Sequence, residues 1–180
     1  MKNKAIFLDR DGVLNRVTVV DGVPQSAKSL SEFIMFDDVP DALDALKKMG
    51  FLLIVITNQP DVARGTIKKE AVEDIHHYLK KKFPIDAIYS CYHDNKDACD
   101  CRKPKSGLIT DAAKYYNISL RSSFVIGDRW KDMLAGKNAQ CRTIFLDAGY
   151  AETKKHTVVA DCVVRSLKEA VEWISALTSE

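Results

Sequence analysis

Short apolar runs alternate with longer amphipathic segments along this chain of 180 residues. The run FLLIVIT, residues 51–57, is almost entirely apolar, which is typical of a parallel strand that is buried on both faces. Strands that alternate with helices fold into a parallel sheet with helices packed on both sides. The sequence therefore predicts an α/β fold.

The strands expected from these runs are residues 4–9, 51–57, 86–90, 123–128, 141–146 and 161–164. The helices expected between them are residues 38–50, 66–83, 106–117 and 130–139. Asp38 is a candidate N-cap of the first helix, and Gly50 is placed to end it. Ser166 and Glu169 have the spacing of a capping box, which predicts a last helix after them.

Two long loops are expected at residues 10–37 and 91–105, and loops of this length in a compact domain are often functional. The chain length and a hydrophobic fraction of 46% suit one domain over residues 1–180. The net charge of +2 is too small to favour nucleic acid or a membrane surface as a partner. The N-terminus lacks the pattern of a signal peptide, and no stretch reaches the ~20 apolar residues of a membrane span. We expect a cytoplasmic monomer.

Carboxylates stand at the ends of two expected strands. Asp9 and Asp11 flank Arg10 directly after the first strand, and residues i and i+2 of an extended backbone point the same way. Asp128 ends another strand, and Asp132 follows about one helical turn later. Nearby carboxylates repel each other unless a cation or a proton lies between them. A cluster of carboxylate oxygens suits Mg²⁺, which often binds together with the phosphates of a substrate.

Two further groups can hold a phosphoryl group against Asp9, because ligands of parallel sheets bind at the carboxyl ends of the strands. Thr57 offers a hydroxyl and a backbone N–H, and Lys103 offers a cation. The Asp9 carboxylate would attack phosphorus to form an aspartyl-phosphate, while Mg²⁺ and Lys103 offset the charge. Asp11 would protonate the leaving alkoxide and then deprotonate the attacking water.

Four segments in this order, FLDRDGVLN, VITNQ, CRKP and VIGDRWKD, resemble the motifs of the haloacid dehalogenase superfamily of phosphatases. Within it, the pattern is similar to the D-glycero-D-manno-heptose 1,7-bisphosphate phosphatases and their relatives, the histidinol-phosphate phosphatases. The likeness runs from Lys4 to about Leu146. It implies a Rossmann-like, doubly wound parallel sheet without a separate cap domain.

The resemblance also implies roles for individual residues. Asp9 would be the nucleophile and Asp11 the general acid and base. Mg²⁺ would be held by the side chains of Asp9 and Asp128 and by the backbone carbonyl of Asp11. The residues at the family's substrate-binding positions are Thr57, Asn58, Arg102 and Lys103.

Three of the five cysteines lie within eleven residues, in the segment CYHDNKDACDC. Clustered cysteines of a cytosolic protein indicate metal ligands rather than disulfides, although chance cysteines or a redox pair are alternatives. Cys91, His93, Cys99 and Cys101 offer three thiolates and one imidazole, which match a closed tetrahedral Zn²⁺ site of structural type. The segment resembles the zinc loop of the heptose and histidinol phosphatases, with a shorter spacer from His93 to Cys99. We therefore expect an inserted loop that binds zinc.

The resemblance favours removal of the 7-phosphate of heptose 1,7-bisphosphate. Histidinol phosphate, another small sugar phosphate, and a non-catalytic binding module are the alternatives. Pro60 stands where familiar members of the family have serine, which indicates a divergent branch. The polar residues of the first long loop that could choose among substrates are Arg16, Gln25, Lys28 and Ser31.

Three basic side chains are further candidates for the site. Arg64 could contact a distal phosphate or be a solvated loop residue. Arg129 and Lys131 stand beside Asp128, and we favour Arg129 as the one that faces the substrate. His76 and His77 are expected to be surface or packing residues of a helix.

Overall fold

The computed structural model describes residues 2–151 and 156–178, and its core is a parallel sheet of six strands. The strand order is β5-β4-β1-β6-β7-β8, and every pair in it is parallel. The strands are β1 (Ala5–Leu8), β4 (Leu52–Asn58), β5 (Ala87–Cys91), β6 (Phe124–Gly127), β7 (Arg142–Leu146) and β8 (Cys162–Val164). The chain runs outwards from β1 in both directions, which confirms the doubly wound α/β fold. That residues 1–180 form one domain stays a prediction.

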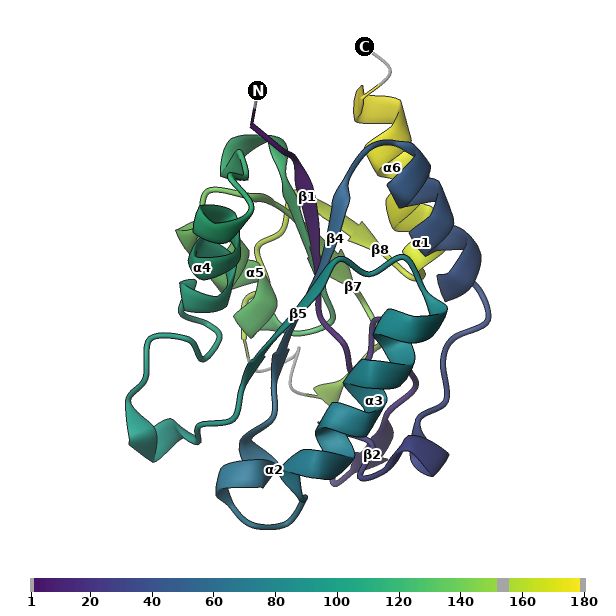
Figure 1. Ribbon diagram of the computed structural model, residues 1–180. Helices are drawn as coiled ribbons and strands as arrows, with labels where there is room; N and C mark the ends of the chain where they lie inside the picture. The colour runs from purple at the N-terminus through teal and green to yellow at the C-terminus, as the bar shows by residue number, and fades with distance from the viewer. Residues whose placement is uncertain (1, 152–155, 179–180) are drawn as a thin grey trace.

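Helices cover both faces of this sheet (Figure 1). The α-helices are α1 (Val39–Lys48), α2 (Pro60–Ala63), α3 (Lys69–Lys82), α4 (Gly107–Tyr115), α5 (Trp130–Asn138) and α6 (Leu167–Thr178). The short 3-10 helices are η1 (Leu30–Glu32), η2 (Asn95–Asp97) and η3 (Leu120–Ser122). Helices α1, α3 and α6 pack on one face of the sheet, and α4 and α5 pack on the other.

Alternate side chains of the central strand belong to two different hydrophobic clusters. Ile6 and Leu8 pack with α1, α3 and α6, whereas Ala5 and Phe7 pack with α4 and α5. All four side chains are completely buried. A strand with both faces covered has no polar face, and this explains why the sequence of β1 is apolar at every position.

The register of the sheet brings the acidic residues to one edge. Leu8 of β1 lies beside Val55 of β4 and Ile126 of β6. Asp9 and Asp128, which follow these positions, therefore meet at the carboxyl end of the sheet. This end lies opposite the two chain termini in Figure 1.

The first long loop contains a hairpin that the sequence analysis did not predict. Strands β2 (Thr18–Val20) and β3 (Val23–Gln25) pair antiparallel across a two-residue turn. Asp21 and Gly22 both have positive φ, of 51° and 76°, as a type I′ turn requires. The Asp-Gly dipeptide between apolar residues is the usual signal for this turn, so the treatment of 10–37 as a plain loop was wrong.

The helix expected at 66–83 begins later, at Lys69. The backbone N–H groups of Thr66 and Ile67 both donate to the carbonyl of Asp61, which closes a turn instead of starting a helix. The short helix α2 precedes this turn and was not predicted.

The predicted caps are partly confirmed. Asp38 stands at the start of α1 without capping it, and its carboxylate instead accepts from the N–H of Lys168 in α6. Ser166 accepts from the N–H of Glu169, as expected, but Glu169 accepts from Arg165 rather than from Ser166. The side chain that precedes α1 thus helps to satisfy the first turn of the neighbouring helix α6.

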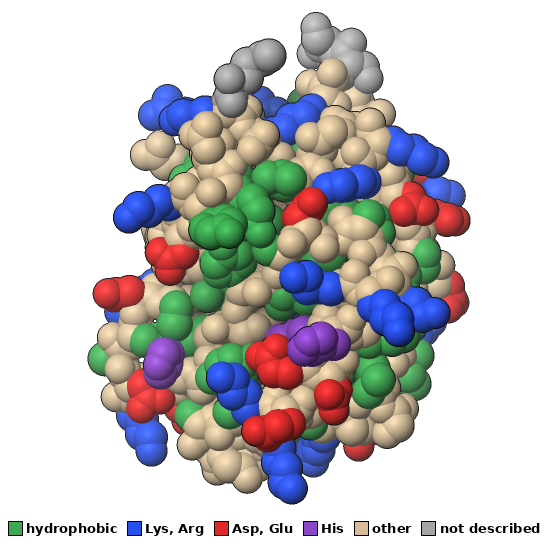
Figure 2. Space-filling model, in the orientation of Figure 1, with side chains coloured by type: hydrophobic (Ala, Val, Ile, Leu, Met, Phe, Trp, Pro, Cys, Tyr) green, Lys and Arg blue, Asp and Glu red, His purple; other side chains and the backbone are tan. Residues whose placement is uncertain are grey.

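No helix of the described residues is long and apolar enough to cross a membrane. On the face shown in Figure 2, basic and acidic side chains are interspersed.

Leu43 of α1 is completely buried in the first cluster, while Asp44 beside it is exposed. We expect Leu43→Ala to lower the free energy of unfolding by about 2–5 kcal/mol, because it leaves a cavity in the core. Asp44→Ala should change it by less than about 0.5 kcal/mol. Urea unfolding followed by circular dichroism measures both, and equal effects would place Leu43 outside the core.

Candidate active site

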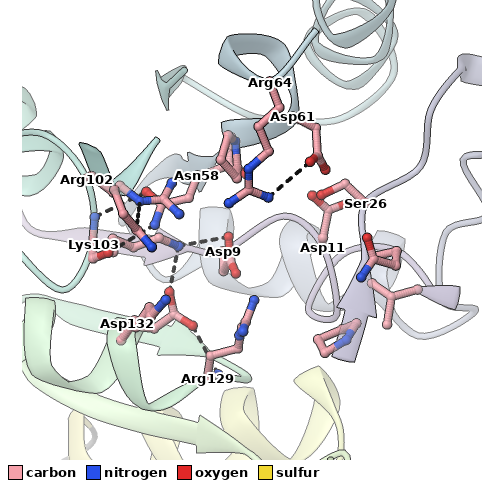
Figure 3. A pocket seen from close by; sticks show the side chains of 17 residues that line it. Asp9, Asp11, Ser26, Asn58, Asp61, Arg64, Arg102, Lys103, Arg129 and Asp132 are labelled. Carbon is pink, nitrogen blue, oxygen red and sulfur yellow. Dashed lines mark hydrogen bonds and ion pairs between the residues drawn. The ribbon is translucent and has the colours of Figure 1, made fainter. Parts of the chain in front are cut away.

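A pocket of about 210 Å³ opens at the carboxyl end of the sheet (Figure 3). Six side chains predicted to act in catalysis or substrate binding line it: Asp9, Asp11, Thr57, Asn58, Arg102 and Lys103. Arg64, Arg129 and Lys131 line it as well, and the β2–β3 hairpin contributes Pro24 and Gln25. The structure therefore brings together residues that are up to 123 positions apart in the sequence, from Asp9 to Asp132.

A buried lysine connects two carboxylates at the floor of the pocket. Lys103 Nζ lies 2.9 Å from Asp9 Oδ1 and 2.6 Å from Asp132 Oδ1, and it donates to the carbonyl of Ile56 at 2.9 Å. Only 3% of Lys103 is exposed. Burial disfavours its charge, but Asp132 and Asp9 outweigh burial and raise the pKa of Lys103 above its ordinary value. The side chain is therefore a fixed cation.

The two carboxylate oxygens of Asp9, which lines the pocket, have different surroundings. Its Oδ1 accepts from Lys103 and from the backbone N–H of Arg10 at 2.8 Å. Among the described residues, none donates a hydrogen bond to Oδ2. Burial raises the pKa of Asp9 to about 6, although Lys103 opposes this shift.

Asp128 forms no ion pair in the described part of the chain, although Lys103 and Arg129 favour its charge and the hydroxyl of Tyr150 lies near it. Both of its carboxylate oxygens are buried without a hydrogen-bond partner there. Ligand oxygens of Asp9, Asp128 and Asp132 lie within 4.8 Å of one another. Burial, followed by repulsion from Asp9 and Asp132, raises the pKa of Asp128 well above its ordinary value. A divalent cation would relieve this repulsion, so the donor set fits Mg²⁺.

Asp11 lies in the opposite electrostatic environment from Asp9. Its Oδ2 accepts from Arg10 Nη2 at 2.8 Å, from Arg10 Nε at 3.2 Å and from Gln59 Nε2 at 2.8 Å. Asn15 Nδ2 donates to Oδ1 at 3.1 Å. Burial works against the charge, but Arg10 and the amides outweigh it and lower the pKa of Asp11.

Asn58 holds the backbone that carries the buried lysine. Its amide donates to the carbonyl of Lys103 at 3.1 Å and accepts from the N–H of Lys103 at 3.1 Å. Both ends of the Asn58 amide are thus in use, and a role in substrate binding stays a prediction. Thr57 is buried at the end of β4, and its hydroxyl accepts from Gln59 Nε2 at 3.0 Å.

The two arginines at the rim are fixed by the loop that follows β5. Arg64 binds Asp94 through Nε at 2.8 Å and Nη2 at 2.7 Å, and binds Asp61 through Nη1 at 3.2 Å. Arg102 donates to the side chain of Asn95 at 2.9 Å and to a main-chain carbonyl of the same loop. The Arg64 side chain is 44% exposed and is also paired with two carboxylates, and it connects α2 to this loop.

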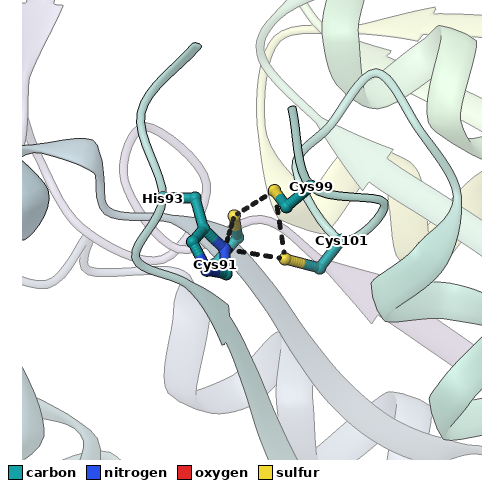
Figure 4. Close-up of side chains that lie close together, drawn as sticks. All are labelled: Cys91, His93, Cys99 and Cys101. Carbon is teal, nitrogen blue, oxygen red and sulfur yellow. Dashed lines mark hydrogen bonds between the residues drawn. The ribbon is translucent and has the colours of Figure 1, made fainter. Parts of the chain in front are cut away.

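The predicted zinc ligands gather in the same loop (Figure 4). Cys91 Sγ lies 3.6 Å from Cys99 Sγ and 3.7 Å from His93 Nδ1. Cys101 Sγ lies 3.4 Å from Cys99 Sγ and 3.3 Å from His93 Nδ1. Zn–S bonds of ≈ 2.3 Å in a tetrahedron separate two sulfurs by about 3.8 Å. The four ligand atoms are therefore arranged as the corners of a site that fits zinc.

Sequence reasoning missed the residues that hold Asp11. The sequence analysis gave Arg10 no role, yet its side chain is completely buried and turns back onto Asp11. Gln59 contacts both Asp11 and Thr57, and His76 of α3 contacts Arg10. The adjacency of Gln59 to Thr57 was the one available signal, because nothing in the sequence joins α3 to β1.

Comparison with known proteins agrees with the resemblance that the sequence motifs indicate. The HAD-hydrolase-like family model matches residues 100–170. A D-glycero-β-D-manno-heptose-1,7-bisphosphate 7-phosphatase of Helicobacter pylori (strain J99) is 38% identical over 178 residues, which cover 96% of this chain and 97% of the relative. The phosphatase of the same name from Escherichia coli (strain K12) is 34% identical over 183 residues, covering 94% and 93%.

The crystal structure of D,D-heptose 1,7-bisphosphate phosphatase from B. bronchiseptica, complexed with magnesium and phosphate, superposes with a TM-score of 0.82. It is 28% identical and covers 98% of this chain and 99% of its own. The fold and the pocket define the class of haloacid dehalogenase-like phosphatases. Within that class, the chain belongs to the D-glycero-D-manno-heptose 1,7-bisphosphate phosphatase family, as its motifs predicted.

Gly12 is required by the position of the Asp128 carboxylate. Its φ is +91°, and a Cβ placed on it would lie 1.8 Å from Asp128 Oδ2. Gly65 offers a matched control, because its φ is +73° and a Cβ there would meet nothing within 4 Å. The two glycines thus share a positive φ, which strains any other residue, and they differ in the steric clash.

We expect Gly65→Ala to lower the free energy of unfolding by about 1–2 kcal/mol, which is the cost of a left-handed alanine. Gly12→Ala should lower it by about 1–3 kcal/mol more, because the Asp128 carboxylate must also move. Urea unfolding of the two variants tests this difference. Equal losses would mean that Asp128 does not crowd Gly12.

Proposed function

We propose that this chain is a Mg²⁺-dependent phosphatase that removes the 7-phosphate of D-glycero-β-D-manno-heptose 1,7-bisphosphate through an aspartyl-phosphate. The observation that carries the chemistry is the Asp9 carboxylate, held on one oxygen by Lys103 at the floor of the pocket. The names of the relatives support the substrate and its β anomer.

Asp9 acts as the nucleophile in the first half of the reaction. Its carboxylate attacks phosphorus, the bond from phosphorus to the sugar oxygen breaks, and Asp11 as a carboxylic acid gives its proton to that oxygen. Lys103 and Thr57 bind the phosphoryl oxygens, and the cation Lys103 offsets their developing charge. The products of this half are the heptose 1-phosphate and the phosphorylated Asp9.

In the second half, Asp11 acts as the base. Its carboxylate takes a proton from water, whose oxygen attacks phosphorus and releases Asp9 and inorganic phosphate. The contacts with Arg10 and the neighbouring amides lower the pKa of Asp11, which favours this carboxylate form. The dianionic phosphate of an arriving substrate acts in the other direction, because a nearby negative charge raises a carboxyl pKa and supplies the acid form.

Mg²⁺ is supported by the orphaned oxygens of Asp128. The side chains of Asp9 and Asp128 and the backbone carbonyl of Asp11 would hold it. When bound, it offsets negative charge on the phosphoryl group.

The basic rim of the pocket supports a substrate with a second phosphate. Arg102, Arg129 and Lys131 line the same pocket as the nucleophile. A bisphosphate carries one anion for the catalytic floor and one for this rim. We infer that the rim receives the 1-phosphate, with Arg129 the favoured contact.

The test is phosphate release with Mg²⁺ from both anomers of heptose 1,7-bisphosphate, histidinol phosphate and a few other sugar phosphates. We expect the highest kcat/KM for the β anomer of the heptose. A preference for histidinol phosphate would overturn the proposed substrate but would leave the proposed phosphatase reaction in place.

Asp9→Asn is the control, because it keeps the volume of the side chain and removes the nucleophile. It should abolish release while the protein stays folded, and turnover near that of wild type would remove Asp9 from this role.

A structural Zn²⁺ at Cys91, His93, Cys99 and Cys101 completes the proposal, since four protein ligands leave no open position for chemistry. We expect the purified protein to contain about one zinc per chain, bound by this four-ligand cluster. Cys99→Ser should lose most of the metal, whereas Cys162→Ser, outside the cluster, should keep it. Elemental analysis measures both variants. A wild-type protein without zinc, or a Cys99→Ser variant with full zinc content, would contradict the site.

A further inference from the structure

An arginine with no exposed surface lies directly behind the catalytic aspartates. The Arg10 guanidinium uses Nε and Nη2 on the same oxygen of Asp11, which leaves Nη1 to be satisfied elsewhere. That nitrogen lies 3.2 Å from His76 Nε2. A buried guanidinium with an unpaired N–H group would be costly. The contact with His76 therefore helps to fix the orientation of the Arg10 guanidinium.

His76 is suited to accept this hydrogen bond. It comes from α3, only 4% of it is exposed, and its Nδ1 lies 3.5 Å from Glu73 Oε2. A guanidinium only donates, so Nε2 must be the acceptor, and this assigns the ring proton to Nδ1, on the side of Glu73. Burial and the charge of Arg10 lower the pKa of His76 to about 4, in agreement with a neutral ring. Glu73 is in turn fixed by the hydroxyl of Tyr92.

We propose that His76 is a positioning residue of the reaction, which fixes the Arg10 guanidinium so that Arg10 holds Asp11 in place for proton transfer. The inference rests on the proposed role of Asp11. The chain of contacts runs from Tyr92 through Glu73, His76 and Arg10 to Asp11, and it joins the face of α3 to the pocket.

The consequence of removing His76 follows from this geometry. Without an acceptor, Arg10 Nη1 is left buried and unsatisfied, and the guanidinium turns to find another partner. The Asp11 carboxylate then loses the two hydrogen bonds from Arg10 that fix its position. Because proton transfer depends on the position of the acid, the leaving oxygen is protonated less effectively.

The choice of substrate separates this effect from a general loss of structure. The kcat/KM of the enzyme reports the steps up to formation of the aspartyl-phosphate. In that half-reaction a sugar alkoxide needs a proton from Asp11, whereas nitrophenolate leaves without one. A displaced Asp11 therefore lowers kcat/KM for the sugar phosphate much more than for p-nitrophenyl phosphate.

The experiment compares three variants on the heptose bisphosphate and p-nitrophenyl phosphate. His76→Leu removes the acceptor, and His76→Gln restores an acceptor oxygen. His77→Leu is the matched control, since His77 is exposed and its Nδ1 bonds to the main-chain carbonyl of Glu73 in its own helix. We expect His76→Leu to lower kcat/KM for the heptose about tenfold, which is part of the roughly 10²–10⁴-fold that a positioned acid contributes, because Asp11 is displaced but still present. For p-nitrophenyl phosphate the expected change is below about twofold, because no acid is needed there.

His76→Gln should recover most of the lost kcat/KM, and His77→Leu should leave kcat/KM for both substrates unchanged. Equal losses on the two substrates, or no loss on either, would overturn the role of His76. If thermal unfolding shows that His76→Leu is not folded at the assay temperature, the comparison uses His76→Phe instead. That variant keeps an aromatic ring but has no acceptor nitrogen.

Failure of the proposed function is visible separately, in the wild type. If the wild type does not hydrolyse the heptose, the comparison uses the alkyl phosphate that it does hydrolyse, and the expectation for His76 is the same. A folded wild type that hydrolyses no phosphate ester would overturn both the proposed function and the role of His76.

Discussion

The repulsion among buried carboxylates is the constraint around which the carboxyl end of the sheet is built. Asp9, Asp128 and Asp132 bring their oxygens within 4.8 Å of one another in a region from which water is largely excluded. Charges of one sign at such distances interact strongly when the effective dielectric is low. Lys103 forms ion pairs with two of the three carboxylates, and the third, Asp128, forms no ion pair with the described residues. The backbone is shaped to the same cluster, since a Cβ on Gly127 would lie 2.2 Å from Asp132 Cβ.

Lys103 comes from a loop, so its position has to be fixed by that loop. Asn58 binds the main chain of Lys103 on both sides, and the carbonyl of Ile56 accepts from its Nζ. The cysteine and histidine ligands stand just before it in sequence and gather the loop at the end of β5. The cysteine–histidine cluster and the floor of the pocket are thus two parts of one arrangement, because the loop that carries the cluster also carries Lys103.

The sheet and the acidic edge were predictable from the sequence because they depend on local patterns. Apolar runs gave the strands, and the residue that follows each run in a parallel sheet must lie at one edge. The support for Asp11 was not predictable, because it depends on Arg10 meeting a residue of α3 that is 66 positions away. The state of Arg64 was open for a similar reason. Its two carboxylate partners come from α2 and from the loop after β5, and no spacing in the sequence brings them together.

The contacts that fix this loop also affect how binding energy is used. Asp94 and Asp97 close a capping box at the start of η2, Arg64 binds Asp94, and Arg102 binds Asn95. A loop tied at so many points has lost most of its conformational entropy before any ligand arrives. A substrate that meets an ordered wall does not have to supply that ordering from its own contacts, so more of its interaction energy is available for affinity and for the transition state. Such preorganisation reduces the share of the binding energy that induced fit would otherwise consume.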